Sequence, residues 1–144
     1  MTLLAFIIAI VVLVAVHELG HFTAARICGV KVLRFSVGFG PKLWGWTSAR
    51  TGTEFLVGVL PLGGYVKFSG DLDASSVPDQ AGLAELKSRV IAEHGPGAER
   101  DYFHFKPVWQ RALIVAAGPL TNFLLAFVLF GLSFAVVGEP VIAP

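Results

Sequence analysis

The string HELGH, residues 17–21, stands at the end of an apolar run, Leu3–Val16, that contains no polar side chain. In an α-helix, side chains four positions apart share a face, so His17 and His21 can present two imidazoles to one metal ion. Glu18 follows one position round the helix, where its carboxylate reaches a metal-bound water. Because ionisable side chains at membrane depth are costly unless they are held by a partner, this placement predicts zinc chemistry inside a membrane.

The HExxH pattern is short, and in a soluble helix most of its occurrences would bind no metal. Here an unliganded His-Glu-His set beside an apolar span would need some other compensation, which makes zinc the favoured interpretation. Gly20, inside the motif, allows another backbone to approach this helix closely.

Composition supports a membrane protein, because 55% of the 144 residues are hydrophobic and only 15% are charged. Two segments reach spanning length, Thr2 to about Cys28 and Pro107 to about Val137. A cleaved signal peptide is the rival interpretation of the first segment. That segment lacks a basic start and a small-residue cleavage site, and its removal would take the metal motif with it.

The basic residues indicate how the chain crosses the membrane. All eleven Lys and Arg lie between Arg26 and Arg111. The positive-inside rule therefore places the loop 29–105 in the cytoplasm and both termini on the external side. The single cysteine, Cys28, excludes an internal disulfide and is interpreted as a small buried residue near the end of the first helix.

Between the spans, residues 29–70 combine β-branched and aromatic residues with Gly and Pro punctuation, which predicts a short antiparallel sheet of up to four strands. The tryptophans at positions 44 and 46 make this sheet too apolar for free solution, so we expect it to dip into the membrane interface. The expected strands are Lys31–Pro41, Leu43–Trp46, Glu54–Leu60 and Tyr65–Phe68.

The remaining segments are a polar cytoplasmic loop at 71–105, a second transmembrane helix at 106–138 and an external tail at 139–144. The fold class is thus a mainly α membrane protein in which the helices at 1–28 and 106–138 flank the loop and its sheet. Gln80–Glu93 is expected to form a short surface helix, and His94 and His104 are expected to be exposed or packing imidazoles rather than ligands. In the second helix Gly118 and Pro119 predict a kink. Asn122 could form a helix–helix hydrogen bond or serve the active site, and its position does not separate the two.

Four motifs occur in order along nearly the whole chain, the exception being the acidic stretch from about Asp71 to Arg100. They are HELGHF, RFSVGFGPKLW, TEF followed by PLGGYVKFSG, and WQRALIVAAGPLTNF. With them the chain resembles the N-terminal part of the site-2 protease family. The resemblance implies an intramembrane zinc metalloprotease of the inner (plasma) membrane. Its partners would be membrane lipid and transmembrane protein substrates already clipped on the outer side, for example of the anti-sigma factor type, with no nucleic acid.

The resemblance also implies roles for individual residues. His17 and His21 would be zinc ligands, and Glu18 would be the catalytic base that takes a proton from zinc-bound water. The strands around Phe55 to Phe68 would match a membrane re-entrant β-sheet that pairs with extended substrate by strand addition. The residues that we expect to bind substrate are Phe55, Gly63, Gly64, Tyr65 and Asn122.

One departure from the family pattern concerns the third zinc ligand. Family members take it from an aspartate in an LDG-type motif on a later helix, after one or two PDZ domains, whereas no aspartate follows Asp101 here. We therefore expect this chain to be the N-terminal half of a protease, inactive by itself. The alternative is a non-catalytic membrane scaffold that binds partner helices or strands through its sheet. A natural reading frame that continues beyond Pro144 into an LDG helix would favour the enzyme.

Overall fold

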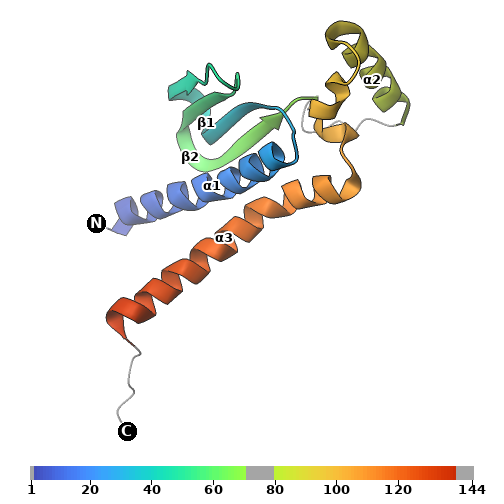
Figure 1. Ribbon diagram of the computed structural model, residues 1–144. Helices are drawn as coiled ribbons and strands as arrows, with labels where there is room; N and C mark the ends of the chain where they lie inside the picture. Colours follow the sequence, from blue (N-terminus) through green and yellow to red (C-terminus); the bar gives the residue numbers. More distant parts are fainter. Residues whose placement is uncertain (1, 71–79, 139–144) are drawn as a thin grey trace.

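The computed structural model describes residues 2–70 and 80–138 and is mainly helical, with two long helices and one antiparallel sheet whose strands follow the first of them in the chain. In Figure 1, α1 and α3 run antiparallel, and the sheet lies on the other side of α1 from α3. This architecture confirms the predicted fold class, and the expected surface helix is present as α2. The elements are α1 (Thr2–Ile27), β1 (Val32–Thr47), β2 (Glu54–Phe68), α2 (Gln80–His94), the 3-10 turns η1 (Ala98–Asp101) and η2 (Phe103–Phe105), and α3 (Val108–Val137).

Two helices are long and apolar enough to cross a membrane, by length and composition. Thr2–Ile27 has a mean hydropathy of 2.6 and Val108–Val136 one of 2.2, and only 11% and 17% of their most apolar windows are buried inside the protein. A core helix of a soluble protein would be mostly covered by its own chain. The exposed apolar side chains of α1 and α3 therefore favour lipid as their surroundings.

The two helices meet at small residues. A Cβ on Gly20 would lie 2.5 Å from the carbonyl oxygen of Ala117, and it would also overlap the hydroxyl of Thr121. The Thr121 hydroxyl lies 3.1 Å from the carbonyl oxygen of Val16 on α1 and 2.8 Å from that of Gly118 on its own helix. The close backbone approach expected at Gly20 is confirmed, because no larger residue fits there.

The sheet consists of two long strands that fold back on themselves rather than four separate short ones. Residues 32–37 pair with residues 64–68 on one side and with residues 54–57 on the other, while residues 42–47 pair with residues 54–58. The rows therefore lie in the order 42–47, 54–58, 32–37 and 64–68, and the pairing of the two central rows runs parallel. Within the described residues, the row 64–68 has a strand partner on one side only, so it is an edge of the sheet.

The buried core lies where the end of α1, the start of β1 and the first turns of α3 meet. It contains Ala24, Ala25, Cys28, Val30, Val32 and Ile114. The buried position of Cys28 confirms its interpretation as a small core residue. The sheet is attached to α1 through the ring of Phe22, which packs edge-on against Phe35 at 5.6 Å and Phe55 at 5.7 Å between centroids.

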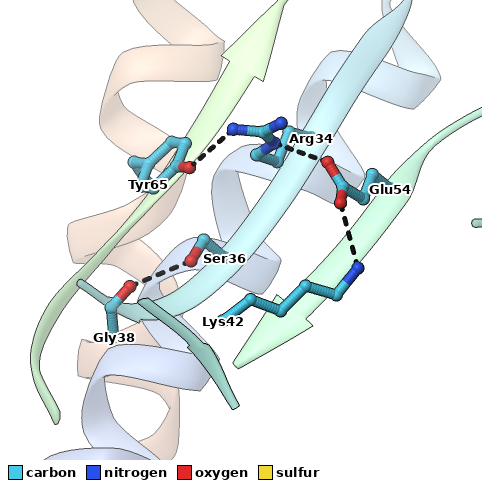
Figure 2. Close-up of polar contacts among 6 residues, drawn as sticks. All are labelled: Arg34, Ser36, Gly38, Lys42, Glu54 and Tyr65. Atoms are coloured by element: carbon cyan, nitrogen blue, oxygen red, sulfur yellow. Dashed lines mark hydrogen bonds and ion pairs between the residues drawn. The ribbon is translucent and has the colours of Figure 1, made fainter. Parts of the chain in front are cut away.

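A polar cluster on the sheet joins all four rows, and it was not predicted from the sequence (Figure 2). Glu54 accepts hydrogen bonds from Arg34 Nε at 2.7 Å and from Lys42 Nζ at 3.1 Å. Arg34 Nη1 also donates to the hydroxyl of Tyr65 at 3.3 Å. The ammonium of Lys42 and the guanidinium of Arg34 lower the pKa of the Glu54 carboxyl, because both favour its charged form.

Candidate active site

The imidazoles of His17 and His21 converge on one point. Their Nε2 atoms are 3.1 Å apart, and the rings meet edge to face. The Nδ1 atom of His21 lies 2.7 Å from the backbone carbonyl oxygen of Ile114 on α3. Since a carbonyl only accepts, Nδ1 of His21 must carry the hydrogen and its Nε2 keeps a free lone pair. An imidazole held in this way is oriented as a metal ligand.

Gly118 makes room for both rings. A Cβ on Gly118 would lie 2.7 Å from His17 Nε2 and would overlap His21 Nε2. α3 continues as one helix through Gly118 and Pro119. The sequence predicts a kink at Gly118 and Pro119 but not the position of Gly118 beside the imidazoles. The small residues at 116–118 were a weak indication of it, because small residues allow a second helix to approach closely.

Glu18 points toward the sheet and is 8% exposed. A Cβ on Gly64 would lie 2.7 Å from Cγ of Glu18 and 3.1 Å from Cγ1 of Val14. The edge row of the sheet therefore passes directly over the carboxylate-bearing side of α1. Only a residue without a side chain allows this approach.

Between α1, the sheet and α3 lies an open cavity of about 360 Å³. It brings together five of the residues predicted from the sequence, which are His17, Glu18, Gly63, Gly64 and Asn122. Apolar side chains complete its wall: Leu13, Val14, Phe39 and Leu62. The arrangement places a potential base, an imidazole and an amide around one space large enough for a peptide segment.

The other three predicted residues lie outside this cavity. His21 reaches it through its contact with His17 and also lines a neighbouring cavity of about 250 Å³ together with Glu18. The ring of Phe55 stacks on Trp46, with centroids 5.0 Å apart. The hydroxyl of Tyr65 is bonded to Arg34 in the polar cluster.

Asn122 on α3 lies beside the paired imidazoles. Its Nδ2 atom is 3.3 Å from Nδ1 of His17, and its Oδ1 atom is buried with no hydrogen-bond partner in the described part of the chain. This contact joins α3 to α1 and also reaches the HELGH motif. It is compatible with both roles considered for Asn122 from the sequence, a helix–helix hydrogen bond and a role in the active site.

The donor set fits a zinc ion in part. Two imidazole nitrogens share one point, and a carboxylate stands next to them, as zinc sites in hydrolases require. Within residues 2–70 and 80–138, however, no three His, Cys, Asp or Glu side chains gather closely enough to hold a metal. Asp71, Asp73 and Asp79 lie outside the described residues. Asp101 is exposed in η1, where its backbone oxygen accepts a hydrogen bond from Lys31 N.

Comparison with known proteins identifies relatives along almost the entire chain. The family model of peptidase family M50 matches residues 5–143. Metalloprotease MmpA of Caulobacter vibrioides is 51% identical over 128 residues, which are 89% of this chain and 32% of MmpA. The regulator of sigma-E protease RseP of Salmonella typhimurium is 45% identical over 142 residues, 99% of this chain and 27% of RseP.

A Rhizobium meliloti protein named as a candidate zinc metalloprotease is 43% identical over 143 residues, 99% of this chain and 36% of that protein. The chain thus spans about a third of the length of the relatives it matches.

Proposed function

Because this chain belongs to peptidase family M50, the site-2 proteases, we propose that the complete protein is an intramembrane zinc metalloendopeptidase and that this chain supplies the first half of its active site. The observation that carries the proposal is the convergence of His17 Nε2 and His21 Nε2, 3.1 Å apart, beside Glu18 under the edge row of the sheet. The names of the relatives agree with this chemistry.

His17 and His21 would hold the zinc ion through Nε2. When bound, zinc polarises a scissile carbonyl and lowers the pKa of a water molecule. Glu18 would act as general base on that water, because its carboxylate follows His17 directly and faces the same cavity.

The substrate would bind as an extended strand on the edge row of the sheet. Residues 64–67 have a strand partner on one side only in the described structure, and Gly63 and Gly64 open that edge toward Glu18. Backbone hydrogen bonds to such an edge would hold a substrate segment unwound, which a peptidase needs because the peptide bonds of a helix are shielded. Asn122, on the opposite wall, could bind the substrate backbone. The substrates would be transmembrane proteins, for example of the anti-sigma factor type.

The location would be the inner (plasma) membrane, with residues 1–28 and 106–138 crossing it. The loop 29–105 would face the cytoplasm, and its sheet at 29–70 would dip into the membrane. Exposed aromatic and aliphatic side chains on the sheet support this placement, among them Leu43, Trp44, Trp46, Leu60 and Leu62. Residues 71–105 would form the polar part of the loop, and 139–144 would lead outward toward a PDZ region.

The third zinc ligand would come from a part of the complete protein outside the described residues. A catalytic zinc ion takes three protein ligands and one water, and the described residues offer two imidazoles.

The test is Glu18→Gln in the complete natural protein, with zinc content and cleavage of a model transmembrane substrate measured together. The amide cannot take a proton, so cleavage should be lost while zinc content stays near that of the parent. Glu85→Gln is the matched control, because Glu85 is an exposed acid on α2 that pairs with Arg89. If Glu18→Gln cleaves as fast as the parent, the enzyme assignment is wrong and the non-catalytic scaffold is the better interpretation.

A further inference from the structure

The amide of Asn122 has one satisfied end and one buried, unpartnered end. Nδ2 lies 3.3 Å from Nδ1 of His17, while Oδ1 has no hydrogen-bond partner within the described residues. The oxygen and nitrogen of an amide have almost the same shape, so turning the group over exchanges their places without moving any other atom. Asn122 can therefore either donate a hydrogen bond to His17 Nδ1 or accept one from it.

The carbonyl oxygen of Ile114 lies 2.7 Å from His21 Nδ1 and requires a hydrogen on that nitrogen, so His21 offers Nε2 to a metal ion. His17 presents its own Nε2 at the same place, 3.1 Å away. The other ring nitrogen of His17, Nδ1, faces the amide of Asn122 at 3.3 Å.

If His17 ligates a metal ion through Nε2, its neutral ring carries the hydrogen on Nδ1. That Nδ1–H needs an acceptor, and of the two ends of the Asn122 amide only Oδ1 accepts. With Oδ1 in the place of Nδ2, the oxygen also gains the hydrogen-bond partner that it lacks within the described residues.

We propose that Asn122 is a positioning residue whose amide Oδ1 accepts the Nδ1–H of His17 and so holds His17 Nε2 toward the metal. The proposal rests on the proposed function, since it takes His17 as a ligand. It differs from a role in substrate binding, because Asn122 then acts on zinc affinity with no substrate present.

The chemistry of the side chain at position 122 separates these roles. Asparagine both donates and accepts, aspartate only accepts, and leucine of similar size does neither. Asn122→Leu should therefore weaken zinc binding, by about 10-fold to 100-fold as is usual for an outer-shell partner. Asn122→Asp should keep zinc affinity at least equal to that of the parent. Ser133→Leu is the matched control, since it replaces an exposed polar residue of the same helix far along α3.

The experiment measures zinc affinity of the complete natural protein by competition with a chelator, without substrate. Nitrogen-15 NMR of the His17 ring in the zinc-bound parent protein accompanies it. We expect hydrogen on Nδ1 and zinc on Nε2. Zinc on Nδ1 of His17 would overturn the proposal, and this readout does not depend on whether any variant folds.

The outcomes also distinguish this proposal from the assignment of the site. If Asn122→Leu binds zinc as tightly as the parent but shows a raised KM, Asn122 binds substrate and the positioning role is wrong, while the protease assignment stands. If Asn122→Asp loses as much zinc affinity as Asn122→Leu, acceptance by the side chain is not what matters and the proposal fails. If His17→Ala leaves zinc affinity unchanged, the metal site itself is wrongly assigned.

Discussion

Gly118 on α3 lies directly against the imidazole of His21 on α1, so that a Cβ at position 118 would overlap Nε2 of the ring. The two predicted ligands, His17 and His21, can therefore face each other only because α3 has a residue without a side chain at this position. The geometry of the site is thus a property of the helix pair, and several variants can test it.

Gly118→Ala should lower zinc affinity about tenfold or more and abolish cleavage, because the new methyl group must push one or both imidazoles from their shared point. Gly131→Ala is the control, since the same change on the same helix meets no atom within 4 Å. The measurement is chelator competition together with the cleavage assay. Parent-like zinc binding in Gly118→Ala would show that the imidazoles do not use this space.

His17→Ala and His21→Ala should lower zinc content as well as activity, in contrast to Glu18→Gln, because each removes a ligand atom rather than the base. The loss of affinity should exceed the roughly 10-fold to 100-fold cost of removing an outer-shell partner. Metal analysis of the purified variants separates the three cases. Full zinc content in either histidine variant would contradict the assigned ligand pair.

Gly64→Val should abolish cleavage while zinc affinity stays within a few-fold of the parent. A Cβ at position 64 would meet Glu18 Cγ and the backbone oxygen of Ser36, so the edge row must move away from the base while the imidazoles keep their contacts with α3. The comparison with Gly118→Ala is informative, since that variant should lose both properties. If Gly64→Val cleaves normally, substrate does not use this edge.

The charge distribution predicts that position 89 is cytoplasmic and position 144 external. Arg89→Cys and Pro144→Cys can be labelled with a membrane-impermeant thiol reagent applied from each side. The native Cys28 is buried and should remain unlabelled. Labelling of position 89 from outside would reverse the topology.

The polar cluster of the sheet should contribute stability that depends on pH. Lys42 and Arg34 lower the pKa of Glu54 below its unfolded value. A group with a lowered folded pKa stabilises the protein above its unfolded pKa, and this contribution is lost as pH falls through the folded pKa. Glu54→Gln should therefore unfold slightly more easily than the parent at neutral pH, and the difference should disappear in acid. A denaturation series over pH measures this, and a difference that grows in acid would contradict it.

Much of the fold could be predicted from the sequence because it depends on near neighbours. The apolar run Leu3–Val16 and the spacing of His17 and His21 determine a helix that carries two imidazoles on one face, whatever surrounds it. The β-branched and aromatic residues between 31 and 68 similarly determined extended structure. The number of strands was less clear from the sequence. β1 turns back on itself from Gly38, where φ is 90°, yet it remains one continuous strand.

The site was decided by contacts between residues far apart in the chain. Ile114 orients His21 across 93 residues, and Asn122 meets His17 across 105. No local pattern specifies such pairs. They depend on which small residues let α1 and α3 approach and on how the sheet folds back over α1. The sequence by itself indicated the candidate ligands His17 and His21, the candidate base Glu18 and the apolar helices that carry them. Only the tertiary structure decided that Gly118 makes room for the imidazoles, that Gly64 covers Glu18 and that Asn122 faces Nδ1 of His17, because packing sets those contacts.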